Sequence, residues 1–228
     1  MLRRNKTTLN NQHHTSVKIV TADPSALGLF GLAIVTLVAS SQKLGLTEGT
    51  ALVLPWAIFL GGIAQLIASF LDSKKNNVFG TTAFGAFGLF WFGVGTTWLI
   101  QMGAFGEKLL ANADSKQLGV VFIGYLIFSL FMTVGAMETH KVLFFIFVLI
   151  DFLFIGLSLS SFDIMYEFSH MLAAISELLI ALLSFYGSAA AVLNPHFGQV
   201  VLPVGKAFGI FKKPNEKEQK TEKHLKVG

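Results

Sequence analysis

The sequence has no cysteine and little charge, and each shortage excludes a class of protein. With Cys 0, the chain can form no disulfide, no thiolate nucleophile and no Cys-ligated metal centre. Charged residues make up only 13% of the 228 residues while hydrophobic residues make up 53%, a balance that does not suit a soluble surface. The composition therefore predicts a membrane protein that crosses the bilayer several times.

Motifs of enzymes are also missing. There is no glycine-rich phosphate loop after a strand, no nucleophile elbow, and no histidine pair at i and i+4 on a helix. Glu138 and His140 adjoin Lys141 between two apolar segments, where a solvated loop is the simplest interpretation. We expect no enzyme activity, no cofactor and no metal. The net charge of +4 comes mainly from the two tails and does not indicate a nucleic-acid partner.

Six apolar segments fill the middle of the chain: 24–42, 50–71, 82–102, 117–137, 141–161 and 170–192. Each has about 19 to 23 residues, enough to cross a hydrocarbon core of about 30 Å at 1.5 Å per residue. We expect an all-α membrane protein with six transmembrane helices bundled around a central path. The domains would be an N-terminal tail (1–22), a transmembrane domain (23–206) and a charged C-terminal tail (207–228).

The distribution of positive charge predicts the orientation in the cell membrane. All but Lys43, Lys108 and Lys116 of the 17 Lys and Arg residues lie on the side that holds both tails. Because cytoplasmic loops carry the excess of Lys and Arg, both termini are expected in the cytoplasm.

The first span opens with Asp23, a good N-cap, and Pro24, which suits a first helical turn. Gly28 and Gly31 follow on one face of that helix. Two roles are open for these glycines: they let a neighbouring helix pack closely, or they let a permeating solute approach the backbone.

Polar residues within the spans are spaced so that they share one helical face. The stripes are Gln65, Ser69 and Asp72 on the second span, Tyr125, Ser129 and Thr133 on the fourth, and His170, Glu177, Ser184 and Ser188 on the sixth. Such stripes indicate a bundle around a polar or partly hydrated path. Hydrogen bonding between helices is the alternative, and it is favoured for Ser and Thr alone.

Two acidic residues stand out within the spans. An ionised carboxylate at mid-membrane costs about 2.5 to 3.5 kcal/mol on insertion scales, and no intramembrane Lys or Arg is available to pair with Asp151 or Glu177. Both are therefore proton-coupling candidates for the symport of an anion. The alternative is that both are protonated, structural carboxyls bonded to a neighbouring helix.

Four segments together resemble a known family. They are Asp23-Pro24-Ser25-Ala26-Leu27-Gly28-Leu29, Gly61-Gly62-Ile63-Ala64-Gln65, Phe79-Gly80-Thr81-Thr82-Ala83-Phe84 through Phe90-Trp91, and Val192-Leu193-Asn194 with Phe197-Gly198 and Leu202-Pro203-Val204-Gly205. In this combination the chain resembles the acetate uptake transporters, or succinate–acetate permeases. Within the first segment, Asp23 replaces the family's Asn and Ala26 replaces its second Pro.

The resemblance implies a homo-hexamer in the lipid bilayer, with a path for acetate, succinate and other short carboxylates in each protomer. It places a hydrophobic constriction at Leu32, Phe87 and Ile150, more aliphatic than is usual in the family, with Gln65 and Thr82 beside it to hold the carboxylate. Proton-linked transport is the function expected. The alternatives are a passive anion or small-solute channel on the same fold and a non-transporting membrane sensor.

Overall fold

The structure, a computed structural model, describes residues 22–211, and no strand occurs in that range. Its elements are α1 (Ser25–Lys43), α2 (Leu54–Trp56), η1 (Ala57–Ala64), α3 (Gln65–Lys74), α4 (Val78–Gln101), α5 (Glu107–Leu110), α6 (Ser115–Ala136), α7 (Lys141–Ser161) and α8 (Tyr166–Phe197). Six helical stretches, with α2, η1 and α3 forming one of them, are long and apolar enough to cross a membrane. This confirms the all-α fold with six spans and makes the chain a multi-pass membrane protein.

The limits of the last span differ most from the prediction. The sequence predicts a span over 170–192, whereas α8 has 32 residues and extends beyond that range at both ends. Residues 1–21 and 212–228, which hold most of the two predicted tails, lie outside the described residues.

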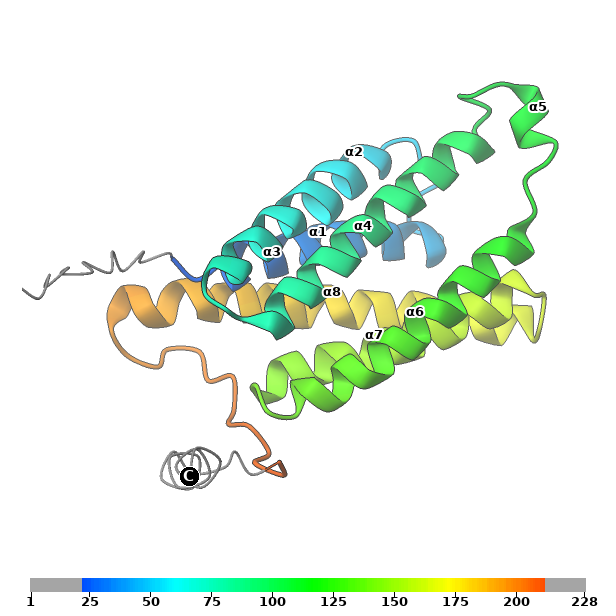
Figure 1. Cartoon of the computed structure of the whole chain (residues 1–228). Coiled ribbons are helices and arrows are strands. Elements are labelled where there is room, and N and C mark those ends of the chain that lie inside the picture. The colour runs from blue at the N-terminus through cyan, green and yellow to red at the C-terminus, as the bar shows by residue number, and fades with distance from the viewer. Residues whose placement is uncertain (1–21, 212–228) are drawn as a thin grey trace, which may run out of the picture.

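The spans form one helical bundle (Figure 1). Their buried side chains make a hydrophobic core of aliphatic residues and aromatic rings. Helix α8 packs against α1 and α7, α6 packs against α7, and η1 with α3 packs against both α1 and α4. The contact between α4 and α6 is largely aromatic: the Phe90 and Tyr125 ring centroids lie 4.9 Å apart, and the Tyr125 hydroxyl donates to the Ala86 carbonyl at 3.1 Å. Large aromatic rings therefore fill the space between α4 and α6, whose backbones stay apart.

Helix α1 begins and α8 ends at the same end of the bundle, which we name the terminal end; the opposite one is the far end (Figure 1). Residues 199–211 run from α8 back across the terminal end. Val142 donates its N–H to the Val204 carbonyl at 3.2 Å, and Phe208 donates to Met137 at 2.9 Å. The Glu138 carboxylate accepts from the Ile210 N–H at 2.8 Å, so it anchors this segment and is not a free loop residue.

The second span contains a π-helix, η1, that the sequence did not predict. Two adjacent glycines let it approach α4 closely: a Cβ on Gly61 would lie 2.6 Å from Trp91 Cγ, and one on Gly62 would lie 2.8 Å from the Phe92 ring. A π-turn holds an extra residue, so it rotates the helix after the turn relative to the helix before it. Gln65 is the first residue of the α-helix that resumes after η1.

Candidate functional site

A cavity of about 520 Å³ lies at the terminal end, between α1, α3, α4, α7 and α8. Its outer wall is polar and includes Asp23, Asp72, Asn77, Thr139, His140 and Asn194. Its inner wall is apolar and includes Leu29, Leu32, Ala83, Phe87, Ile146, Phe147 and Ile150. The cavity therefore passes from a polar opening to an apolar inner end.

Leu32, Phe87 and Ile150 stand at the inner end of the cavity. All three are buried, and all three also line a second, much smaller cavity of about 20 Å³ together with Thr36 and Ile180. A space of that size holds about one water molecule. The three side chains predicted to form a constriction thus come together from α1, α4 and α7 as the partition between two cavities.

The ring of Phe87 is held from several sides. Its centroid lies 5.6 Å from that of Phe128, 6.0 Å from that of Phe147 and 6.4 Å from that of Phe154. Edge-to-face and offset contacts of this kind fix ring orientation as well as bury area. The partition is therefore preorganised by α6 and α7, although Phe87 itself belongs to α4.

Gln65 lines the cavity and is only 1% exposed, and its Nε2 has no hydrogen-bond partner within residues 22–211. A buried amide without a partner is costly, so such a group favours a bound acceptor. The side chain can donate to a carboxylate that enters the cavity. Thr82, the other residue expected to hold a carboxylate, is exposed on α4 and does not line the cavity.

Gly28 and Gly31 lie in helix contacts and not among the residues that line the cavity. A Cβ on Gly28 would overlap the Phe84 ring of α4, and a Cβ on Gly31 would overlap the Leu60 carbonyl oxygen of η1. Both positions lack a side chain because α1 meets its neighbours there.

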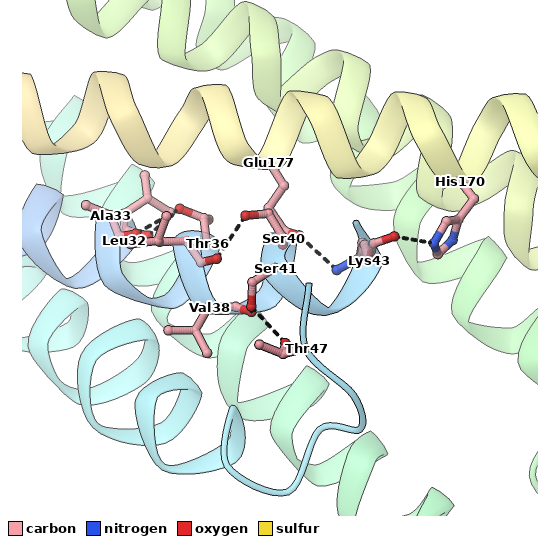
Figure 2. Close-up of polar contacts among 11 residues, drawn as sticks. Leu32, Ala33, Thr36, Val38, Ser40, Ser41, Lys43, Thr47, His170 and Glu177 are labelled. Atoms are coloured by element: carbon pink, nitrogen blue, oxygen red, sulfur yellow. Dashed lines mark hydrogen bonds and ion pairs between the residues drawn. The ribbon is translucent and has the colours of Figure 1, made fainter. Parts of the chain in front are cut away.

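Glu177 is 2% exposed and forms an ion pair with Lys43, whose Nζ lies 2.9 Å from Glu177 Oε2. Figure 2 shows Glu177 reaching from α8 toward the end of α1, where His170 Nε2 also lies 3.1 Å from the Lys43 carbonyl oxygen. The prediction that no intramembrane Lys or Arg is available to pair with Glu177 is therefore wrong, because Lys43 is the last residue of α1. A lysine stem is long enough to bring a charge from a helix end to a partner inside the bundle.

Asp151 faces α6, where its Oδ2 accepts a hydrogen bond from Thr133 Oγ1 at 2.8 Å. Neither Asp151 nor Glu177 lines either cavity. The sixth-span stripe behaves similarly: Ser188 donates to the Ala26 carbonyl of α1 at 2.7 Å, and Ser184 is buried. Asp151, Glu177 and Ser188 therefore join helices, and none of these groups forms the wall of the cavity.

The structure adds polar residues that sequence reasoning did not select for the site: Asp72, Asn77, His140 and Asn194. Asp72 is recognisable as the outer member of the stripe that contains Gln65. Asn77 and His140 each precede a helix and accept from its first backbone N–H groups, a position that an N-cap pattern can reveal. Asn194 belongs to the last family segment, and its sequence context suggests no role for it.

His140 is half-buried, contrary to the solvated-loop interpretation, and its Nδ1 accepts the Leu143 N–H at 3.1 Å. Burial lowers the pKa of His140, and the nearby Asp23 charge only partly opposes this. The unfolded chain therefore takes up a proton more readily than the folded one. Stability should fall as the pH drops below about 6.5, the usual value for histidine, and stop falling below the lowered pKa.

The replacement His140→Asn tests this expectation because asparagine keeps an acceptor at the N-cap and does not titrate. Thermal unfolding of the two proteins, measured across this pH range, should show the smaller acid loss in the variant. An equal loss in both proteins would assign the pH dependence to other groups.

Known proteins with similar sequences include several that are named as transporters. The succinate-acetate/proton symporter SatP of Escherichia coli (strain K12) is 33% identical over 187 residues, which cover 82% of this chain and 96% of SatP. Acetate permease A of Emericella nidulans is 27% identical over 143 residues, covering 59% of this chain and 47% of the permease. A structure of the bacterial acetate channel SatP matches with a TM-score of 0.75 and 31% identity, over 82% of this chain and 100% of that one. Residues 5–207 match the GPR1/FUN34/yaaH family, and the chain therefore belongs to that family.

Proposed function

We propose that this protein transports acetate and related short carboxylates such as succinate across the cell membrane, with proton coupling. The observation that carries the proposal is the partition of Leu32, Phe87 and Ile150 between two cavities of the bundle. Its relatives include proteins named as a symporter, a permease and a channel for these substrates. The side of the bundle with the excess of Lys and Arg is its terminal end, and we take this end to face the cytoplasm.

An apolar partition suits this class of substrate. Acetate has a methyl group beside its carboxylate, so the methyl group and the neutral acid can pass an apolar neck that resists hydrated inorganic anions. Gln65 lies on the side of the neck that faces the larger cavity. There its free Nε2 would donate to the carboxylate before or after passage. Assembly into a homo-hexamer, with one path in each protomer, is part of the proposal and rests on the family.

Uptake of labelled acetate into proteoliposomes tests the proposal. With an inward proton gradient, the protein should accumulate acetate above its equilibrium distribution, and collapse of the gradient should abolish this accumulation. Equilibration without accumulation would favour the passive channel that the name of the solved relative describes. Absence of flux from a folded oligomer would favour a non-transporting sensor, and native mass spectrometry of the same sample would count the protomers.

A further inference from the structure

We propose that the carboxyl group of Asp72 carries the proton in the cavity. This inference rests on the proposed function and deepens it, because it names the group that couples proton to substrate. Neither Asp151 nor Glu177 can fill this role without rearrangement: one is bonded to Thr133 of α6, the other is paired with Lys43, and neither lines the cavity. Asp72 does line it.

The surroundings of Asp72 leave one of its oxygens free. The side chain is 2% exposed, and its Oδ1 accepts from Asn77 Nδ2 at 3.1 Å. Its Oδ2 has no hydrogen-bond partner in the part of the chain that the structure describes. The backbone of Gly80 lies so close that a Cβ there would overlap Oδ2. A buried carboxylate oxygen without a donor is costly, whereas a protonated carboxyl presents a hydrogen-bond donor.

The charges around the cavity also favour a proton on Asp72. Among the described residues, no lysine or arginine lines it, and its titratable groups are Asp23 before α1, Asp72 on α3 and His140 before α7. Lys74 and Lys75, the nearest lysines in sequence, are exposed and do not line the cavity. Asn77, the residue before α4, and Asn194 of α8 also line the cavity and are uncharged. The carboxyl groups of Asp23 and Asp72 repel a carboxylate anion when they are ionised, so the substrate enters more easily together with a proton.

Asp72 and Gln65 lie on one helix face at different depths of the cavity. They are seven residues apart, or about 10 Å along the axis at 1.5 Å per residue. Gln65 lies toward the apolar partition and Asp72 toward the polar opening. A substrate therefore meets the amide donor and the carboxyl at successive positions in the same cavity.

The proton step for uptake is balanced in atoms and charge. Asp72, protonated at rest, first releases its proton to water at the opening. The neutral acid then arrives through the partition, its O–H bond breaks, and an O–H bond forms again on Asp72 Oδ2, which restores the starting state. The substrate leaves through the opening as its anion. One proton and one carboxylate have crossed together, and the reverse sequence gives export.

Proteoliposomes that contain the purified protein test this assignment through two measurements. One is accumulation of labelled acetate driven by a pH gradient, and the other is exchange of labelled for unlabelled acetate at equal pH. Asp72→Asn should lose both accumulation and exchange, because the amide preserves shape and the contact with Asn77 but can neither take the proton from the arriving acid nor return it. Asp72→Glu should restore both. The matched control Asp163→Asn, at an exposed site, should behave as wild type.

Other results would overturn the assignment. Wild-type accumulation in Asp72→Asn would show that another group carries the proton, and its loss in Asp151→Asn instead would identify that group. Loss of both accumulation and exchange in folded Asp72→Asn that Asp72→Glu does not restore would make Asp72 a binding or structural residue. If the wild-type protein neither accumulates nor exchanges acetate, the proposed function fails before Asp72 is tested.

A second measurement needs no variant. Dicyclohexylcarbodiimide modifies protonated carboxyl groups that are shielded from water, and peptide mass spectrometry locates the modified residue. In the wild-type protein Asp72 should be modified, and acetate should reduce the modification. Absence of modification at Asp72, or modification that acetate leaves unchanged, would overturn the assignment even if Asp72→Asn did not fold.

Discussion

Leu32→Trp should abolish acetate flux while the protein remains a folded membrane bundle. Leu32 is buried and lies between the two cavities, so an indole there fills the neck that the substrate has to pass. Overpacking of this kind costs about 1–3 kcal/mol, which lowers the unfolding midpoint without preventing folding. Acetate uptake into proteoliposomes measures the flux, and size-exclusion chromatography with thermal unfolding measures the fold.

Leu37→Trp is the matched control for this experiment. Leu37 lies on the same helix, α1, but it is exposed on the outside of the described bundle. The same substitution there should leave flux near the wild-type level. If Leu32→Trp transports acetate as well as Leu37→Trp does, then Leu32, Phe87 and Ile150 do not form the constriction.

Lys43→Met should be the most destabilising single change at the far end. It leaves Glu177 as an unpaired, buried carboxylate between α1 and α8, the two helices joined by the 2.9 Å ion pair. Breaking a buried pair by removing one partner costs about 3–5 kcal/mol. The measurement is the free energy of unfolding in detergent, obtained from denaturant titration.

The double variant Lys43→Met/Glu177→Leu should recover much of this loss, because replacing both charges with apolar groups leaves neither one uncompensated. Lys108→Met, at an exposed lysine of α5, controls for the loss of a positive charge and should be close to neutral. If the double variant is as unstable as Lys43→Met, the ion pair does not account for the cost.

The spans and the family could be read from the sequence because they depend on local properties. The length and apolarity of a segment determine whether it can cross a bilayer, and the six predicted segments correspond to the six helical stretches of the structure. The family segments around Asp23, Gly61 and Asn194 are likewise short stretches of sequence, and membership in the family is confirmed. The constriction assigned from the resemblance stays a prediction until flux is measured.

The partners of the polar residues could not be read in the same way. Helical spacing shows that Gln65 and Asp72 share a face, but not that this face meets a cavity. Lys43 and Glu177 are 134 positions apart, and the fold brings them together at the end of α1. The same limit applies to Gly28 and Gly31, whose spacing fits close packing and solute passage equally well.

Segment length, apolarity and short motifs were enough to predict a helical chain, six membrane spans and the family. Which carboxyl group faces the cavity, and which ones join helices, depends on how the helices pack. Local periodicity sets the face of a helix, whereas helix crossing and the register change at η1 set the neighbour that this face meets. Asp72 and Glu177 are both buried acids on striped helices, yet one lines a cavity and the other is neutralised by Lys43.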